Sequence, residues 1–427
     1  MTTSAPAQQS RRVLARRIVA FAGAPFISLI APFFFLPVLA RLAGEDAWVA
    51  IAVGQSVGGF AALVAGMGYP TLAPPVLAQA SDAARRRYVA TSLVVRGPVW
   101  LIAAGASGAV AALLAPDGYV VEASATAVAL SIAGLAPTWY WIGVGRAMPI
   151  LWAEVLPRAG AMVLAAAALL MGGALIWYPV LLSVAMAAGP AVIYARIARG
   201  GFAGWHRREA LEIARRHPPA VIAETAAGAY NALAVTLVAH ATSVGEAARY
   251  VSGDKAYRIG QYGVSSLGNA LQGWVVERGE ASASRRMKAA VGLHLALGVG
   301  GGGAFALVGP ALTRFLFGTS IAIDHVTAAG FGVAILGISV GTVFGRIGLV
   351  MLGARRAFMT CVVSASVVGA TGLLIGASLW GAAGAAWALG STELISGVAQ
   401  ATVLAVVWRR RVTAGRALVQ HDPQISA

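Results

Sequence analysis

Apolar stretches long enough to cross a membrane recur along almost the whole chain, from residue 18 to residue 408. A helix needs about 20 consecutive apolar residues to cross the hydrocarbon core of a bilayer, and it satisfies its own backbone hydrogen bonds there. Charged residues make up only 11% of the 427 residues, whereas soluble domains carry about 25%. A membrane barrel would instead show alternating segments of about 10 residues, a pattern missing from this sequence. The sequence therefore predicts an all-α polytopic membrane protein.

We expect about twelve transmembrane helices, divided into two groups of six by the polar connection 196–218. The expected spans are residues 18–40, 47–69, 89–115, 123–145, 150–171, 174–195, 219–241, 250–275, 289–316, 324–350, 357–379 and 382–408. The division predicts an N-terminal lobe over 18–195 and a C-terminal lobe over 219–408, joined by a basic cytoplasmic linker. Residues 1–17 and 409–427 are expected to form cytoplasmic tails.

Basic residues are concentrated in every second connection between the expected spans. These connections, counted from the N-terminal tail, hold 24 of the 32 Lys and Arg residues. Cytoplasmic loops carry an excess of Lys and Arg, so we expect a multi-pass membrane protein with both termini in the cytoplasm. No signal-peptide cleavage site follows the first apolar stretch, which is expected to be retained. The same loop charges account for the net charge of +16, and no nucleic-acid partner is expected.

Catalytic signatures are missing from the sequence. The stretch GVGGGG at 298–303 matches G-x-G-x-x-G, but it lies inside an apolar helix with no preceding strand, so it does not indicate a dinucleotide site. The sequence contains no Walker A, H-E-x-x-H or G-x-S-x-G motif. We therefore expect a protein that is not an enzyme and uses no cofactor and no metal. With Cys361 as its one cysteine, it can form no internal disulfide.

Charged side chains inside the expected spans are the main functional signal. They comprise the cations Arg96, Arg158, Lys255, Arg258 and Arg346 and the acids Glu154, Glu224, Asp254 and Glu393. A cation at the centre of a bilayer costs about 2.5–3.5 kcal/mol on insertion scales. Such residues are therefore expected to contact polar partners or a water-filled cavity.

The stretch YVSGDKAYRIGQYG, residues 250–263, concentrates this signal. On a helix, Tyr250, Asp254, Tyr257 and Arg258 share one face, and the acid and the arginine, four residues apart, can form an ion pair. Lys255, at the edge of that face, adds positive charge. Two interpretations stay open: a cationic cavity wall suited to an anionic, hydroxyl-rich ligand, and a structural ion pair near the outer interface.

Other embedded charges have the same two interpretations. Glu154 and Arg158 are four residues apart and are expected to pair across Pro157. Arg96 precedes Gly97 and Pro98, where a kink is expected, and Arg346 lies between two glycines, so that a ligand can approach it closely.

Carboxylates in the spans are also candidates for ion coupling, because an acid in a dry site can carry a proton. The candidates are Glu224, which shares a helix face with Asn231, and Glu393; helix–helix hydrogen bonding is the alternative. The aromatic group Trp139, Tyr140 and Trp141 lies near a helix end, where a membrane-interface belt is the favoured interpretation and stacking on sugars the alternative.

Four stretches, taken in order, are similar to the polysaccharide flippases of the multidrug/oligosaccharidyl-lipid/polysaccharide (MOP) exporter superfamily. The first two spans of that family resemble residues 36–70, LPVLARLAGEDAWVAIAVGQSVGGFAALVAGMGYP. The turn between its fourth and fifth spans resembles residues 137–160, PTWYWIGVGRAMPILWAEVLPRAG. RYVSGDKAYRIGQYG (249–263) resembles the start of its eighth span, and GAAGAAWALGSTELIS (381–396) resembles its last span. The resemblance covers most of the chain.

This resemblance implies two six-helix lobes around a central cavity. It also implies alternating-access passage of a polyprenyl-pyrophosphate-linked oligosaccharide from the inner to the outer leaflet of the bacterial plasma (inner) membrane, for surface polysaccharide biosynthesis. It implies that Arg96, Lys255, Arg258 and Arg346 bind the anionic cargo, with Arg158, Arg41 and Asp254 as further cavity residues. Expected partners are the lipid-linked oligosaccharide, membrane lipids, and a polysaccharide polymerase or ligase. The alternatives are a cation-coupled multidrug exporter on the same fold and a lipid II flippase; a membrane-embedded glycosyltransferase would need a larger outer loop than this chain offers.

Overall fold

The computed structural model describes residues 32–146, 148–198, 212, 218–276 and 280–421. Every regular element in these ranges is helical, and eight helices there are long and apolar enough to cross a membrane. The expectation of an all-α polytopic membrane protein is confirmed. The N-terminal tail and most of the expected basic linker 196–218 lie outside the described residues.

The chain falls into two compact units, which divide between Thr236 and Leu237, inside one long helix. The helices of the first unit are α2 (Pro32–Leu42), α3 (Gly44–Gly66), α4 (Tyr69–Gln79), α5 (Asp82–Leu114), α6 (Val120–Ser131), the 3₁₀ segment η1 (Ile132–Leu135), α7 (Thr138–Gly143), α8 (Met148–Ile150), the π-helical segment η2 (Leu151–Val155), α9 (Leu156–Leu170), α10 (Trp177–Ala198) and the first part of α12 (Pro218–Ala241). The expected lobe limits stay a prediction.

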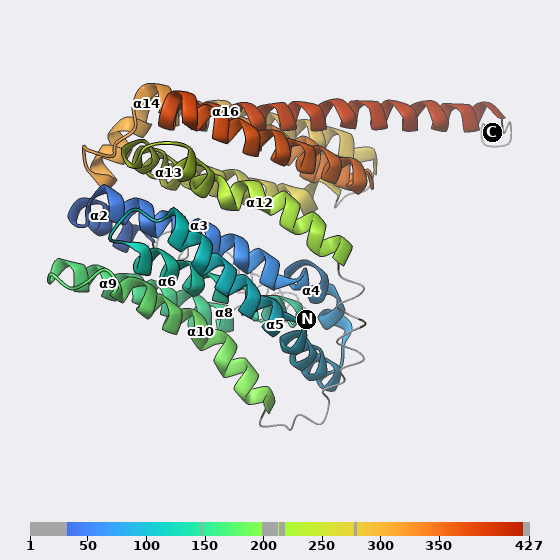
Figure 1. Cartoon of the computed structure of the whole chain (residues 1–427). Helices are drawn as coiled ribbons and strands as arrows, with labels where there is room; N and C mark the ends of the chain where they lie inside the picture. Colours follow the sequence, from blue (N-terminus) through green and yellow to red (C-terminus); the bar gives the residue numbers. More distant parts are fainter. Residues whose placement is uncertain (1–31, 147, 199–211, 213–217, 277–279, 422–427) are drawn as a thin grey trace, which may run out of the picture. The chain divides into compact units, whose positions relative to one another are not determined.

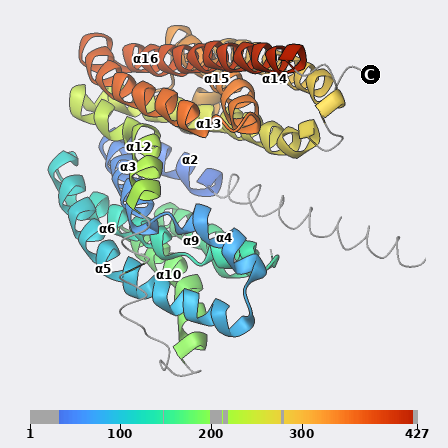
Figure 2. The same ribbon diagram turned by 90° about the vertical axis from the view of Figure 1, so that its right-hand side faces the viewer.

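The second unit contains fewer and longer helices. They are the end of α12, α13 (Val244–Val276), α14 (Glu280–Phe317), α15 (His325–Gly341), the π-helical segment η3 (Thr342–Leu349) and α16 (Arg355–His421). Figures 1 and 2 show α13, α14, α15 and α16 packed side by side.

Helix α3 forms the centre of the first unit. Two thirds of its most apolar stretch is buried inside the unit, and its large Trp48 is 1% exposed. Gly54 and Gly58 let the backbone of α3 approach α6 closely, because a Cβ at either position would collide with backbone carbonyl oxygens of α6. Small residues serve this purpose in membrane helices, where lipid provides no hydrophobic force between helices.

Helix α15 has the corresponding role in the second unit. It packs between α14 and α16, and its glycines Gly330 and Gly337 lie against the α16 backbone. On the other side, Gly302 of α14 and Gly332 approach each other with no room for a Cβ on either. The backbone-to-backbone packing positions the residues of α16 next to those of α13.

Helix α16 is two membrane-crossing helices joined by a turn of two residues. Trp380 and Gly381 have non-helical backbone angles, and Gly381 adopts φ +58°, which favours glycine. The arms touch where Gly376 and Gly384 meet. This turn separates the expected spans 357–379 and 382–408, and the helix then continues to His421, through most of the expected C-terminal tail.

Candidate functional site

The most polar face inside the spans belongs to α13. Arg258 donates from Nε to Asp254 Oδ2 at 2.8 Å, so the predicted ion pair is confirmed. The Asp254 side chain is 3% exposed and the Arg258 side chain 37%. The acid is therefore enclosed by the packing, whereas part of the guanidinium is accessible.

Aromatic packing encloses the acid of this pair. Tyr250 and Tyr257, both fully buried, pack tilted against Phe331 of α15, each with ring centroids 5.4 Å apart. Gly253 makes room for Phe331, whose ring a Cβ at that position would overlap. The tyrosines were predicted on the same face as the ion pair, and the structure assigns them to the contact between α13 and α15.

Two further titratable side chains lie near this face. Lys255 follows Asp254 on α13 and is partly buried. Glu393 of α16 is partly buried and within electrostatic range of Tyr257. Gly337 lets α15 pack closely against α16 at this point, because a Cβ added to Gly337 would lie 2.8 Å from the Cβ of Glu393. Among the described residues, the Glu393 carboxylate accepts no hydrogen bond.

Arg346 lies in the π-helical segment η3 and has an exposed side chain. Its Nη2 donates to Asn269 Oδ1 of α13 at 2.6 Å. π-helical turns are rare and occur often at functional sites. Sequence reasoning missed Asn269, although a signal existed: it lies 11 residues after Arg258, three helical turns further along the same side of α13.

Arg96 of α5 occupies a buried cage in the first unit. It is 1% exposed, and its guanidinium donates to the carbonyl oxygens of Gly134 and Ala136, at the end of η1. Its Cζ lies 5.4 Å from the ring centroid of Tyr69 and 5.6 Å from that of Trp139. Arg96 thus joins α5 to the 3₁₀ segment, and the helix continues through Gly97 and Pro98.

The membrane-belt interpretation of Trp139 is wrong. The side chain is 2% exposed and packs with Tyr69, Tyr88 and Arg96 inside the first unit. Tyr140 and Trp141 are partly buried and contact each other edge to face.

Among the described residues, no direct contact joins Glu154 to Arg158, although the two side chains lie within electrostatic range of each other. Glu154 instead accepts a hydrogen bond from the Thr138 hydroxyl of α7, and its Oε1 has no hydrogen-bond partner among the described residues. The cause is η2: a π-helical turn takes in an extra residue, so positions four apart no longer lie directly above each other. Arg158 is partly buried.

The remaining predicted residues are dispersed. Arg41 is exposed in the last turn of α2, and Asn231 is partly buried in α12. Glu224 lies on α12, but its side chain is outside the described residues. The structure thus brings together Asp254, Lys255 and Arg258 on α13. Glu393 of α16 lies near Tyr257 of this face, and Arg346 of η3 contacts α13 farther along, at Asn269.

Comparisons with known proteins identify the fold. Neither a family model nor a curated protein matches the chain. An inward-facing multidrug resistance MATE family transporter of the MOP superfamily matches with TM-score 0.67 and 14% identity, over 91% of this chain and 94% of that one. The lipid II flippase MurJ, inward closed, matches with TM-score 0.67 and 12% identity, over 90% and 87%.

A third similar structure is a MOP superfamily transporter from Pyrococcus furiosus, for which reverse polarity of the binding pocket suggests a different function. It matches with TM-score 0.59 and 13% identity, over 94% of this chain and 95% of that one. The chain therefore has the fold of MOP superfamily transporters. These neighbours are transporters or flippases, and the expectation that this chain is not an enzyme stays a prediction.

Proposed function

We propose that this chain is a flippase that moves a polyprenyl-pyrophosphate-linked oligosaccharide from the inner to the outer leaflet of the bacterial plasma membrane, for surface polysaccharide biosynthesis. The observation that carries the proposal is the pair of accessible guanidinium groups anchored on α13. Arg258 is held by Asp254 at 2.8 Å and Arg346 by Asn269 at 2.6 Å. Arg346 belongs to a helix long and apolar enough to cross a membrane, and Arg258 belongs to the expected span 250–275.

Arginine is suited to the anionic end of such a cargo. Its guanidinium stays charged and presents five donors in a planar fork, which matches phosphate oxygens. Anchoring by Asp254 and by Asn269 fixes each fork while leaving part of it accessible. The two anchoring positions lie three helical turns apart, about 16 Å along α13, so each fork is suited to a separate anionic group of the cargo, the pyrophosphate at one and an acidic sugar at the other.

The balance of embedded charge also favours an anionic cargo. The spans contain five cations, Arg96, Arg158, Lys255, Arg258 and Arg346, and four acids. Arg96 is enclosed by carbonyl groups and aromatic rings, so we assign it a structural role in place of cargo binding. The proposed cargo contacts are then Arg258, Arg346 and Lys255, with Arg158 and Arg41 as secondary candidates.

Alternating access moves the polar headgroup while the lipid tail stays in the bilayer. The MOP fold has been seen in inward-facing and outward-facing conformations, which supports this mode of transport. Glu393 and Glu224 are our candidates for ion coupling, because a buried carboxylate can take up and release a proton during such a cycle.

Two alternatives on the same fold have specific support. MATE transporters are among the similar structures, and the partly buried Glu393 would be suited to a cationic drug. MurJ supports a lipid II flippase. The Pyrococcus furiosus neighbour is described as having reverse pocket polarity, which supports the idea that pocket charge, and with it cargo, varies on this fold.

The proposal is tested by the sidedness of lipid-linked oligosaccharide in cells depleted of this protein. We expect accumulation in the cytoplasmic leaflet, rescued by the wild-type chain and by Arg356→Ala, a control at an exposed arginine of the same unit, but not by Arg258→Ala. Rescue by Arg258→Ala would overturn the site. Normal sidedness of the lipid-linked oligosaccharide, combined with sensitivity of the cells to cationic dyes, would favour the drug exporter. Accumulation of lipid II in the cytoplasmic leaflet would favour the lipid II flippase.

A further inference from the structure

One side of α13 carries a polar strip between the two anchored arginines of the proposed cargo site. The strip begins at Arg258 and ends at Asn269, whose side-chain oxygen holds Arg346 at 2.6 Å. Tyr262 and Ser265 lie between the two ends. At about 100° per residue, these four side chains of α13 fall within about 60° of one another around the helix axis. The strip is therefore continuous over three helical turns, about 16 Å.

The strip lies on the side of α13 that faces away from the core of the second unit. Tyr262 is 46% exposed, Asn269 is exposed and Ser265 is partly buried. Val264 and Leu271, on the opposite side of the helix, are buried. Polar side chains on a membrane-crossing segment require water or polar partners, because hydrocarbon offers no hydrogen bonds. A polar ligand therefore fits this side of α13 better than a lipid chain does.

The two ends of the strip differ in charge. Arg346 is held by the neutral amide of Asn269, and among the described residues no acid forms an ion pair with it. Arg258 is held by the Asp254 carboxylate at 2.8 Å, which offsets its charge, and the adjacent Lys255 adds a second cation at that end. The more highly charged anion therefore fits the Arg346 end, and a single carboxylate fits the Arg258 end.

Glu393, the acid of α16 near this face, lies off the strip. It is within electrostatic range of Tyr257, whose side chain points about 100° around the helix from Arg258 and packs against Phe331 of α15. The Arg258 end of the strip thus presents its guanidinium on a different side of α13 from the one nearest to Glu393.

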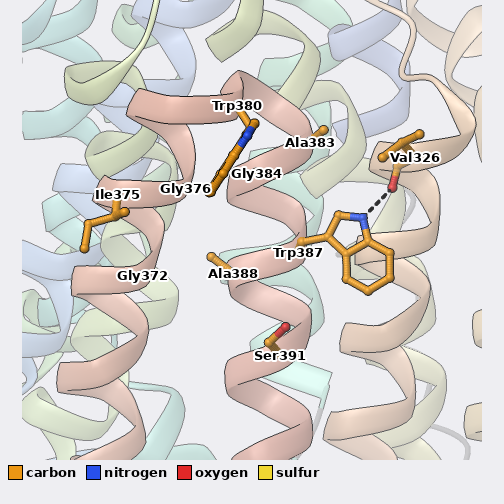
Figure 3. Close-up of a pocket in the computed structure, with 10 residues that line it drawn as sticks. All are labelled: Val326, Gly372, Ile375, Gly376, Trp380, Ala383, Gly384, Trp387, Ala388 and Ser391. Atoms are coloured by element: carbon orange, nitrogen blue, oxygen red, sulfur yellow. Dashed lines mark hydrogen bonds between the residues drawn. The ribbon is translucent and has the colours of Figure 1, made fainter.

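The middle of the strip has the chemistry that neutral sugar rings require. Tyr262 presents an aromatic face and a hydroxyl, and the Ser265 hydroxyl can donate and accept hydrogen bonds. The pocket on the α16 hairpin lacks these groups (Figure 3): small and apolar residues form most of its lining, and the indole of Trp387 already donates to Val326 O at 3.1 Å. A sugar therefore fits the strip on α13 and not that pocket.

We infer that the strip binds an acidic oligosaccharide, with its pyrophosphate at Arg346, neutral sugar rings along Tyr262 and Ser265, and a carboxylate-bearing sugar at Arg258. This inference rests on the proposed function and narrows its cargo class: a separation of about 16 Å requires more than one ring between the pyrophosphate and the acidic sugar. The Asn269 end also precedes the basic connection after α13, which is expected to be cytoplasmic, and the lipid-linked pyrophosphate enters from that leaflet.

The first test compares two cargoes on the wild-type chain in vesicles. Both are fluorescent polyprenyl-pyrophosphate tetrasaccharides; one ends in glucuronic acid and the other in glucose. At limiting concentration we expect the acidic probe to be flipped about tenfold faster, the effect of one charge-assisted contact. Equal rates would overturn this inference and leave the flippase in place. Flipping of neither probe, together with transport of a cationic dye, would overturn the proposed function itself.

Variants assign the two ends of the strip. The double variant Asp254→Asn/Arg258→Gln removes the ion pair without leaving a lone buried carboxylate, and thermal unfolding in detergent verifies that it is folded. It is expected to lose most of the preference for the acidic probe while the rate for the neutral probe stays the same. Arg346→Gln is expected to slow both probes about tenfold. A preference that survives in the double variant would overturn the assignment of the acidic sugar to Arg258.

A second set of variants tests the middle of the strip. Tyr262→Ala is expected to slow both probes by the same factor, because both carry the neutral rings, and Tyr262→Phe is expected to recover part of the rate by restoring the aromatic face. The control is Ile259→Ala, an exposed site about 100° around the helix from Arg258, where both rates should be unchanged. Equal rates in Tyr262→Ala and the wild type would contradict a sugar contact at this position.

Discussion

At the scale of single residues, the Asp254–Arg258 pair shows how one side chain can be buried and its partner accessible. Removing one side chain of the pair breaks this ion pair, and the resulting loss of stability depends on how deeply the remaining side chain is buried. Asp254 is 2% exposed and surrounded by Tyr250, Tyr257 and Phe331. A lone carboxylate in that packing is unfavourable, whereas a lone guanidinium at Arg258 can reach solvent.

A double-mutant cycle on this pair makes the difference measurable. We expect Arg258→Ala to destabilise the protein by about 2 kcal/mol, between the values for exposed and fully buried pairs. Asp254→Ala should cost less, and adding it to Arg258→Ala should restore part of the lost stability. The measurement is the thermal unfolding midpoint in detergent; additive losses in the double variant would contradict the enclosed-acid interpretation.

Arg96 gives a second prediction, because its role is assigned to structure and not to cargo. Arg96→Ala removes the donors to the Gly134 and Ala136 carbonyls and leaves a cavity beside Tyr69 and Trp139. We expect a loss of about 3 kcal/mol, and Arg96→Lys should recover only part of it because an ammonium cannot reproduce the fork.

The readout for Arg96 is the yield and dispersity of purified protein together with its transport rate. Lower yield of Arg96→Ala with a normal rate per folded molecule would support the structural role. A normally folded variant without transport would contradict it and return Arg96 to the cargo site.

The sequence predicted the contacts between near neighbours and missed the ones that depend on tertiary structure. The Asp254–Arg258 pair follows from helical spacing alone. The acceptors of Arg96 lie 38 and 40 residues away along the chain, and backbone carbonyls carry no sequence signature. Glu154 could not be placed because a π-helical turn, which shifts the spacing of side chains, is not readable from the residues.

At the scale of helices, glycines decide how closely α15 and α16 pack. Gly330 and Gly337 of α15 and Gly390 and Gly397 of α16 each lie against backbone of the other helix. This close packing brings Glu393 next to the polar face of α13. Sequence reasoning identified the spans but not this packing, because glycines are frequent in membrane helices and their partners are set by the fold.

Two glycine substitutions separate packing from intrinsic helix propensity. A Cβ at Gly337 would lie 2.8 Å from the Glu393 Cβ, whereas one at Gly300 of α14 would meet nothing within 4 Å. We expect Gly337→Ala to destabilise the protein by about 1–3 kcal/mol and Gly300→Ala to stabilise it by about 0.5–1 kcal/mol. Thermal unfolding in detergent gives both values, and equal effects at the two sites would disprove the packing role of Gly337.

At the scale of the whole molecule, the order of spans is the property that the sequence specifies best. The expected spans from residue 47 onward correspond to helices, including the division of α16 at Trp380 and Gly381. Apolar length alone identifies most of them, although α13, rich in Gly, Ser, Gln and Asn as well as charges, lies outside the eight helices that are long and apolar enough to cross a membrane. Fold likeness at 12–14% identity with MATE and MurJ structures reflects this pattern of spans, which persists while side chains change.

Cargo identity depends on a few charged side chains and not on the span pattern, so it requires a direct measurement. That measurement is transport by the purified chain in vesicles, with a fluorescent polyprenyl-pyrophosphate-linked oligosaccharide and a cationic dye tested side by side. Our account predicts flipping of the lipid-linked oligosaccharide that is lost in the double variant Arg258→Ala/Arg346→Ala, kept in Arg356→Ala, and no transport of the dye. Dye transport with an immobile oligosaccharide would contradict it.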